Sequence, residues 1–339
     1  MPRVSFLLPV YNGATFLAET LTSLENQTMD DFDILVVDDG STDHSAQVVA
    51  DFPSTRIRMI SQANAGLVSA LNFGLKNLDC EFVARIDADD TSVPDRLAQQ
   101  LDFMGFTGAV AVSGKAHNID VSGNLLGVSS PEYDFHRADA GFIPAREPYL
   151  PHPFLTARLD VIQQLGGFRN AHLAEDSDLC WRLHEHYRIA IQPQIMGRYR
   201  IHQGSISANS VASLRIQAVF SQLASLNATR RDSDQPEVRY DLSIDDARTA
   251  AASVMGIIDL LSGLSSAEIR HLTAASALKL ADLSNWRKAM LDKSDIELAQ
   301  KALRKVKLSA ENSDKIAQIF NAVRVRQPDL FARKWYHRT

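Results

Sequence analysis

The sequence predicts an α/β fold with a mostly parallel central sheet covered by helices on both faces, followed by a C-terminal α-helical region. Short apolar runs alternate with helical stretches over the first 90 residues, a pattern typical of parallel sheets. From about Ser210 onward the pattern becomes helical throughout. The length of 339 residues favours two domains, which we place at 1–208 and 209–339.

The strands of the first domain are apolar runs that end at turn signals. The first run ends at Asn12-Gly13, and Gly40 follows the second. Pro94 suits the first turn of a helix, and Gly166-Gly167 ends a short one. We therefore expect strands at 5–10, 33–37, 56–61, 82–86, 109–118 and 188–201, and helices at 16–24, 67–78, 94–103, 160–165 and 176–186.

The helical region contains two N-terminal capping signals. Ser265 with Glu268, and Ser294 with Glu297, have capping-box spacing. In this motif each side chain accepts a hydrogen bond from the backbone amide of the other residue. We therefore expect one helix to begin at each serine.

The composition is that of a cytoplasmic globular protein. Lys and Arg number 35 against 41 Asp and Glu, and the net charge of −6 argues against nucleic acid as the main partner. Only two cysteines, Cys80 and Cys180, are present, which excludes a disulfide framework and suits a reducing cytosol. No apolar run reaches 18 residues, so we expect no membrane span.

Polar side chains follow the first two predicted strands. Tyr11 and Asn12 follow the first strand, and Asp38 and Asp39 follow the second. Ligands of doubly wound sheets bind beyond the carboxyl ends of the strands, so these side chains suit a base and a ribose. The alternative is that the two acids only cap the next helix.

A second acidic cluster follows the fourth predicted strand. Asp87 and Asp89 are two residues apart, so on an extended chain both point the same way. With Asp90 they place three carboxylates within four residues, which repel one another unless a cation neutralises them. Mg²⁺ or Mn²⁺ suits such oxygen ligands and can bridge to a diphosphate. A solvated acidic loop is the alternative.

Two further features suit catalysis. Glu175 and Asp176 open a predicted helix, whose N-terminus favours ionised carboxylates, so one of them suits a general base. Ordinary helix capping is the alternative. His202 follows the last predicted strand and suits a metal ligand, although a lone histidine is more often a surface residue.

Seven motifs, taken together and in order, resemble the inverting family 2 glycosyltransferases of the bacterial surface and exopolysaccharide type. They span roughly 3–208 and read VSFLLPVYNG, SLENQT, DILVVDDGSTD, ANAGLVSALNFGL, ARIDADD followed by PDRL, LGGFRNAHLAEDSDLCWRL and YRIHQGSIS. The resemblance implies the Rossmann-like GT-A fold and transfer of a sugar from a nucleotide-sugar donor, with a DxD motif that binds a divalent metal. The segment after 210 matches no motif of the family.

The resemblance also implies roles for individual residues. Asp176 matches the catalytic base, and Glu175 a neighbour that orients the acceptor. Asp87 and Asp89 match the metal-binding DxD pair, and His202 completes the metal shell in some relatives. The residues implied in nucleotide-sugar binding are Pro9, Tyr11, Asn12, Asp38, Asp39, Asn64, Gly66, Asn72, Asp87, Ala88 and Asp89. Among these, Tyr11 lies against the base and Asp39 at the uracil edge.

The sequence therefore predicts an inverting hexosyltransferase of class EC 2.4 that uses Mn²⁺ or Mg²⁺. The resemblance implies a UDP-hexose or UDP-N-acetylhexosamine donor and a glycan or lipid-linked glycan acceptor. A nucleotidyltransferase would need a glycine- and basic-rich phosphate loop, which the segment after the first strand lacks. Two further hypotheses are a catalytically silent nucleotide-sugar-binding or scaffold protein, and a helical region that docks onto a polysaccharide assembly machine.

The C-terminal tail suggests a peripheral contact at the inner face of the plasma membrane. Five Lys and Arg side chains but one acid lie between Arg324 and Thr339, with Trp335 and Tyr336 among them. Basic and aromatic side chains suit an anionic lipid surface. The alternative is a solvated helix end, where cations are favourable in any case.

Overall fold

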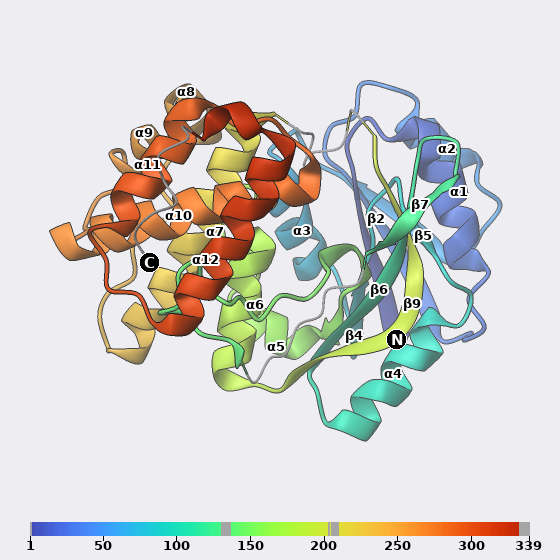
Figure 1. Cartoon of the computed structure of the whole chain (residues 1–339). Helices are drawn as coiled ribbons and strands as arrows, with labels where there is room; N and C mark the ends of the chain where they lie inside the picture. The colour runs from blue at the N-terminus through green and yellow to red at the C-terminus, as the bar shows by residue number, and fades with distance from the viewer. Residues whose placement is uncertain (1, 130–136, 203, 205–209, 332–339) are drawn as a thin grey trace. The chain divides into compact units, whose positions relative to one another are not determined.

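The computed structural model describes residues 2–129, 137–202, 204 and 210–331 (Figure 1). The chain divides into two compact units. The first comprises Met1–Phe135, Pro148–Arg169 and Arg182–His202, and the second His136–Glu147, Asn170–Trp181 and Gln203–Thr339. The second unit therefore takes two segments from within the predicted 1–208 domain, and a division into domains at 208 stays a prediction.

The described residues of the first unit form a nine-stranded sheet in the order β3-β2-β1-β4-β8-β6-β9-β5, with β7 paired to β6. The strands are β1 Val4–Val10, β2 Phe32–Asp38, β3 Ile57–Ser61, β4 Phe82–Arg85, β5 Thr91–Ser92, β6 Ala111–Ile119, β7 Leu125–Ser129, β8 Thr156–Arg158 and β9 Ile189–Arg200. Strands β3, β2, β1 and β4 are parallel, as are β6 and β9. The sheet is mixed where we predicted a mostly parallel one, because β5, β7 and β8 follow loops and turns instead of crossover helices and pair antiparallel.

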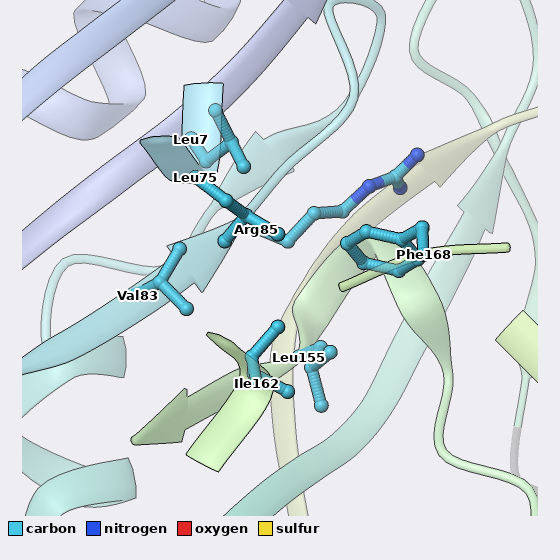
Figure 2. A pocket seen from close by; sticks show the side chains of 7 residues that line it. All are labelled: Leu7, Leu75, Val83, Arg85, Leu155, Ile162 and Phe168. Atoms are coloured by element: carbon cyan, nitrogen blue, oxygen red, sulfur yellow. The ribbon is translucent and has the colours of Figure 1, made fainter. Parts of the chain in front are cut away.

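Helices cover both faces of this sheet, as predicted. They are α1 Ala14–Glu25, α2 Ser45–Asp51, α3 Leu67–Lys76, α4 Arg96–Thr107, α5 Leu159–Gln164 and the end of α6 Glu175–His186. Side chains alternate along β1. Phe6 therefore joins the buried cluster that includes Leu17 of α1 and Leu97 of α4. Leu7 faces the other way, towards Leu75 of α3 (Figure 2).

The second unit is mostly helical, as predicted. Its helices are α7 Val211–Asp232, α8 Ile244–Ala250, α9 Val254–Ile258, α10 Ser266–Arg287, α11 Lys293–Leu303 and α12 Ala310–Arg326 (yellow to red in Figure 1). Phe220 of α7 and Leu272 of α10 lie in one buried core, which Ala174 of the 170–181 segment also joins. No helix of the described residues is long and apolar enough to cross a membrane.

One of the two predicted capping boxes is confirmed. Ser265 and Glu268 cap α10, whereas α11 begins earlier than predicted, with Asp292 and Asp295 as its capping box. The reason is a tertiary contact. The buried guanidinium of Arg215 donates hydrogen bonds to both of these carboxylates, and this pairing fixes where the helix starts.

Candidate active site

Three neighbouring parallel strands bring the predicted polar residues to one edge of the sheet. Val10 at the end of β1 pairs with Asp38 at the end of β2, and β4 ends beside β1. The Asp39 amide donates to the Val10 carbonyl at 2.8 Å. The segments after all three strands therefore leave the sheet at the same edge, as we predicted from the strand ends.

Asn12 organises the loop that follows β2. Its backbone has a positive φ of 52°, which asparagine tolerates better than most residues. Its side-chain carbonyl accepts hydrogen bonds from the amides of Thr42 at 2.8 Å and Asp43 at 3.2 Å. Tyr11 beside it is 53% exposed, so its ring is accessible to a ligand. Pro9, in contrast, is buried within β1.

The Asp39 carboxylate is saturated by donors of its own chain. It accepts from the amides of Ala65 at 2.9 Å and Gly66 at 2.8 Å, and from the side-chain amides of Gln62 and Asn64. Gly66 has a φ of 87°, which favours glycine there. Asp39, Asn64 and Gly66, all predicted to bind the donor, thus lie in one hydrogen-bonded arrangement, in which Asp39 is buried and Asn64 and Gly66 are exposed.

The alternative that Asp38 and Asp39 cap the next helix is wrong. Helix α2 begins at Ser45, and Asp43 accepts from the Ser45 amide at 2.9 Å. Burial raises the pKa of Asp43, but hydrogen bonds from Ser45 and Ala14 outweigh this and lower it overall. Asp38 instead accepts from the Ser41 amide at 3.0 Å, which shapes the turn after β2.

The carboxylates of Asp87, Asp89 and Asp90 form the acidic cluster. One oxygen from each lies within 4.8 Å of the others, and this is the single group of potential metal ligands among the described residues. Asp90 is fully buried; its Oδ1 accepts from the Arg200 amide at 2.8 Å, and its Oδ2 has no hydrogen-bond partner. Burial, then the charges of Asp89 and Asp87, raise its pKa well above its usual range.

This cluster fits a hard divalent cation. Three converging carboxylate oxygens are the ligand type that Mg²⁺ and Mn²⁺ prefer. The buried Asp90 Oδ2 has no donor, and a nearby cation would relieve the repulsion among the three acids. We predicted Asp87 and Asp89 from the DxD pattern but did not include Asp90, although it is adjacent in the sequence.

The two DxD carboxylates have different surroundings. The buried guanidinium of Arg85 pairs with Asp87, with Nη1 2.6 Å from Oδ2. Figure 2 shows the stem of Arg85 passing apolar side chains, among them Phe168, which line a small cavity. Asp89 instead lies 2.8 Å from Nε2 of His202. Each of the two carboxylates therefore has its own neighbour, Arg85 for Asp87 and His202 for Asp89.

Asn72 holds the backbone of the segment after α5, a structural role that we did not predict. Its amide group exchanges two hydrogen bonds with the backbone of Phe168, at 2.8 and 2.9 Å. A Cβ at Gly167 would overlap with the Asn72 side-chain oxygen, so the neighbouring glycine allows this close contact. Asn72 thus fixes the segment after α5.

Glu175 and Asp176 lie in the first turn of α6, in the second unit, where the macrodipole favours them. Next to them, buried Ser177 donates to Glu147 at 2.7 Å. Glu147 also accepts from Gln222 at 3.2 Å and pairs with Lys279 at 2.6 Å. Nothing in the sequence marks Glu147, an isolated acid in a proline-rich segment.

The fold is the GT-A fold. The structure of S. aureus TarS 1-349 in complex with UDP-GlcNAc aligns with a TM-score of 0.56 at 18% identity, over 98% of this chain and 93% of that one. Mannosyltransferase PcManGT from Pyrobaculum calidifontis, in complex with GDP-Man and Mn²⁺, aligns with a TM-score of 0.54 at 18% identity, over 97% and 88%.

Comparison of the sequence with known families and proteins also finds glycosyltransferases. Residues 5–166, a little under half of the chain, match the model of glycosyl transferase family 2. EpsH from Bacillus subtilis (strain 168) is 35% identical over 127 residues. That match covers 37% of this chain and 37% of EpsH, so the chain spans little more than a third of this relative's length.

Proposed function

We propose that this protein is an inverting glycosyltransferase of surface polysaccharide assembly. It transfers a hexose or N-acetylhexosamine from a UDP-sugar to a hydroxyl of a growing glycan or lipid-linked acceptor. The observation that supports this best is the Asp87–Asp90 cluster at the carboxyl end of β4, in a family 2 domain. The solved structures with UDP-GlcNAc, and with GDP-Man and Mn²⁺, support a nucleotide-sugar donor and a metal.

Each group of residues has one task in this proposal. Tyr11 packs on the base, and the loop that Asp39 holds encloses the nucleotide, with Asp38 beside it. Asp89, Asp87 and His202 would hold a divalent cation, which would supply charge neutralisation for the diphosphate leaving group. Ala88 lies between the two DxD acids at the donor.

Asp176 is the general base, and Glu175 orients the acceptor. Asp176 takes the proton of the acceptor hydroxyl as its oxygen attacks the anomeric carbon. The bond from that carbon to the diphosphate oxygen breaks on the opposite face, and the electron pair leaves with UDP. A single displacement of this kind inverts the anomeric centre.

We propose a cytoplasmic location, with peripheral contact at the inner face of the plasma membrane through the basic and aromatic tail. The argument is compositional: anionic lipid attracts the cations of the tail. Residues 332–339, which include Trp335 and Tyr336, lie outside the described residues.

The test is a screen of nucleotide sugars for slow metal-dependent hydrolysis, comparing wild type with Asp89→Ala. We expect one donor to release its nucleoside diphosphate in the presence of Mn²⁺ or Mg²⁺. The hydrolysis rate of the variant should be lower by at least about a hundredfold, because the substitution removes a metal ligand. Asp79→Ala, an exposed acid near β4, is the matched control.

Two outcomes would separate the proposal from its alternative. No hydrolysis together with no metal-dependent nucleotide binding would overturn it in favour of a silent binding or scaffold protein. Binding without hydrolysis would instead call for adding acceptors, because transfer then depends on the second substrate.

A further inference from the structure

The backbone of the loop that contains Asp89 is held from α1 by a buried hydroxyl. Oγ1 of Thr20 lies 2.9 Å from the carbonyl oxygen of Ala88 and 2.8 Å from that of Asp90. Thr20 is fully buried, and its single proton serves one carbonyl at a time. These carbonyls belong to the residues on either side of Asp89, and both lie within reach of the hydroxyl, so a hydrogen bond to either one restrains the turn at Asp89.

Arg200 at the end of β9 holds the same loop from another element. Its Nε donates to the Asp89 carbonyl at 2.9 Å, and its amide donates to the Asp90 carboxylate at 2.8 Å. The guanidinium is itself anchored. It pairs with Glu19 at 2.6 Å and lies 4.4 Å from the centre of the Phe16 ring.

These contacts oppose a force that the acidic cluster creates. Three carboxylates within 4.8 Å repel one another when no cation is bound, which favours a spread loop. Thr20 and Arg200 hold the backbone, and Thr20 adds no charge to the site. The loop is therefore kept in one shape by donors from two other elements, which bind its backbone carbonyls and the Asp90 carboxylate.

We propose that Thr20 and Arg200 are positioning residues that preorganise the Ala88–Asp90 loop for a divalent cation. The inference rests on the proposed function, in which Asp89 is a metal ligand. Groups that orient metal ligands without touching the metal commonly change metal affinity by 10–100-fold when they are removed. Thr20 is not among the residues that the sequence motifs mark.

The test measures the Kd of Mn²⁺ by calorimetry on the full chain, without nucleotide sugar. Thr20→Val keeps the shape of the side chain and removes the donor, so we expect about tenfold weaker binding. Thr20→Ser restores the hydroxyl and should bind within about twofold of wild type. Thr22→Val is the matched control. Thr22 lies exposed in the same helix, and its hydroxyl donates to the Ala18 carbonyl at 2.7 Å.

The outcomes separate this inference from the function on which it rests. If wild type and Thr20→Val bind Mn²⁺ equally, the inference is wrong and the metal site stands. If wild type binds neither Mn²⁺ nor Mg²⁺, the metal-dependent function itself is wrong. If Thr20→Val does not fold, the Kd is measured on Arg200→Lys instead. Lysine keeps the positive charge but lacks the Nε donor to the Asp89 carbonyl. An unchanged Kd in Arg200→Lys would likewise overturn the inference.

Discussion

At the scale of single residues, three aspartates near the same sheet edge have different environments. Asp39 accepts from two backbone amides and two side-chain amides. Hydrogen bonds lower the pKa of Asp43 although burial raises it, whereas burial and like charges raise that of Asp90. Of these three, only Asp90 combines burial with an oxygen that lacks a donor, which distinguishes it from the two acids that shape loops.

The general base gives a residue-scale prediction. Asp176→Asn keeps the size of the side chain but removes the proton acceptor. We therefore expect transfer to fall by about a hundredfold or more while the Kd for UDP stays unchanged. Transfer is measured by product formation and binding by calorimetry. Asp160→Asn, in the first turn of α5, is the matched control for a change at a helix N-terminus.

Equal losses of transfer and UDP binding in Asp176→Asn would contradict the base assignment. That result would mean that Asp176 supports the fold around α6, where it accepts from the Ser177 amide at 2.7 Å. Unchanged transfer would exclude Asp176 from the reaction altogether.

At the scale of elements, the start of α10 gives a pH prediction. Hydrogen bonds from Arg230, and then from Ser265, lower the pKa of Glu268 from 4.5 to about 2, against the opposing effect of burial. Because the folded pKa is depressed, this stabilisation is present above about pH 4.5 and is lost as pH falls towards 2. Glu268→Gln should therefore reduce the free energy of unfolding by about 1–2 kcal/mol at pH 7, and by progressively less below pH 4.5.

Urea unfolding at pH 7, 5 and 3 measures this difference. Glu297→Gln in α11 is the control, because its pair with Lys293 at 3.6 Å is exposed and should change stability by less than about 0.5 kcal/mol. A difference between wild type and Glu268→Gln that stays constant from pH 7 to 3 would show that the charge of Glu268 does not stabilise the cap.

Element by element, the sequence predicts what depends on local pattern. The apolar strands and the Ser265–Glu268 cap follow from spacing, and the position of the acidic cluster follows from its place after a strand. The start of α11 does not, because Arg215 reaches it from α7. Thr20 was missed for the same reason, because it acts through a contact with another segment. Arg85 was missed although its partner Asp87 is only two residues away, because a single arginine within a strand gives no sign of the pairing.

At the scale of the whole molecule, the helical unit includes two segments that precede it in the sequence. Trp181 of the 170–181 segment and Ala145 of the 136–147 segment are buried in one cluster with Ala224 and Ala228 of α7. Glu147 is likewise paired with Lys279 of α10. The residues around Asp176 are therefore completed by helices that lie after position 210 in the sequence.

Truncation after residue 208 tests whether the helical region is an obligate part of the core. Removing α7 to α12 would take Ala224 and Ala228 from Trp181 and the Lys279 cation from Glu147, and an unpaired buried charge costs roughly 3–5 kcal/mol. We expect the 1–208 fragment to be cleaved within 136–147 and 170–181 in limited proteolysis and to lose transfer. Truncation after residue 331, which keeps all described helices, is the control and should leave the Tm unchanged. A 1–208 fragment that resists proteolysis and transfers sugar at the wild-type rate would instead make the helical region a separate docking module.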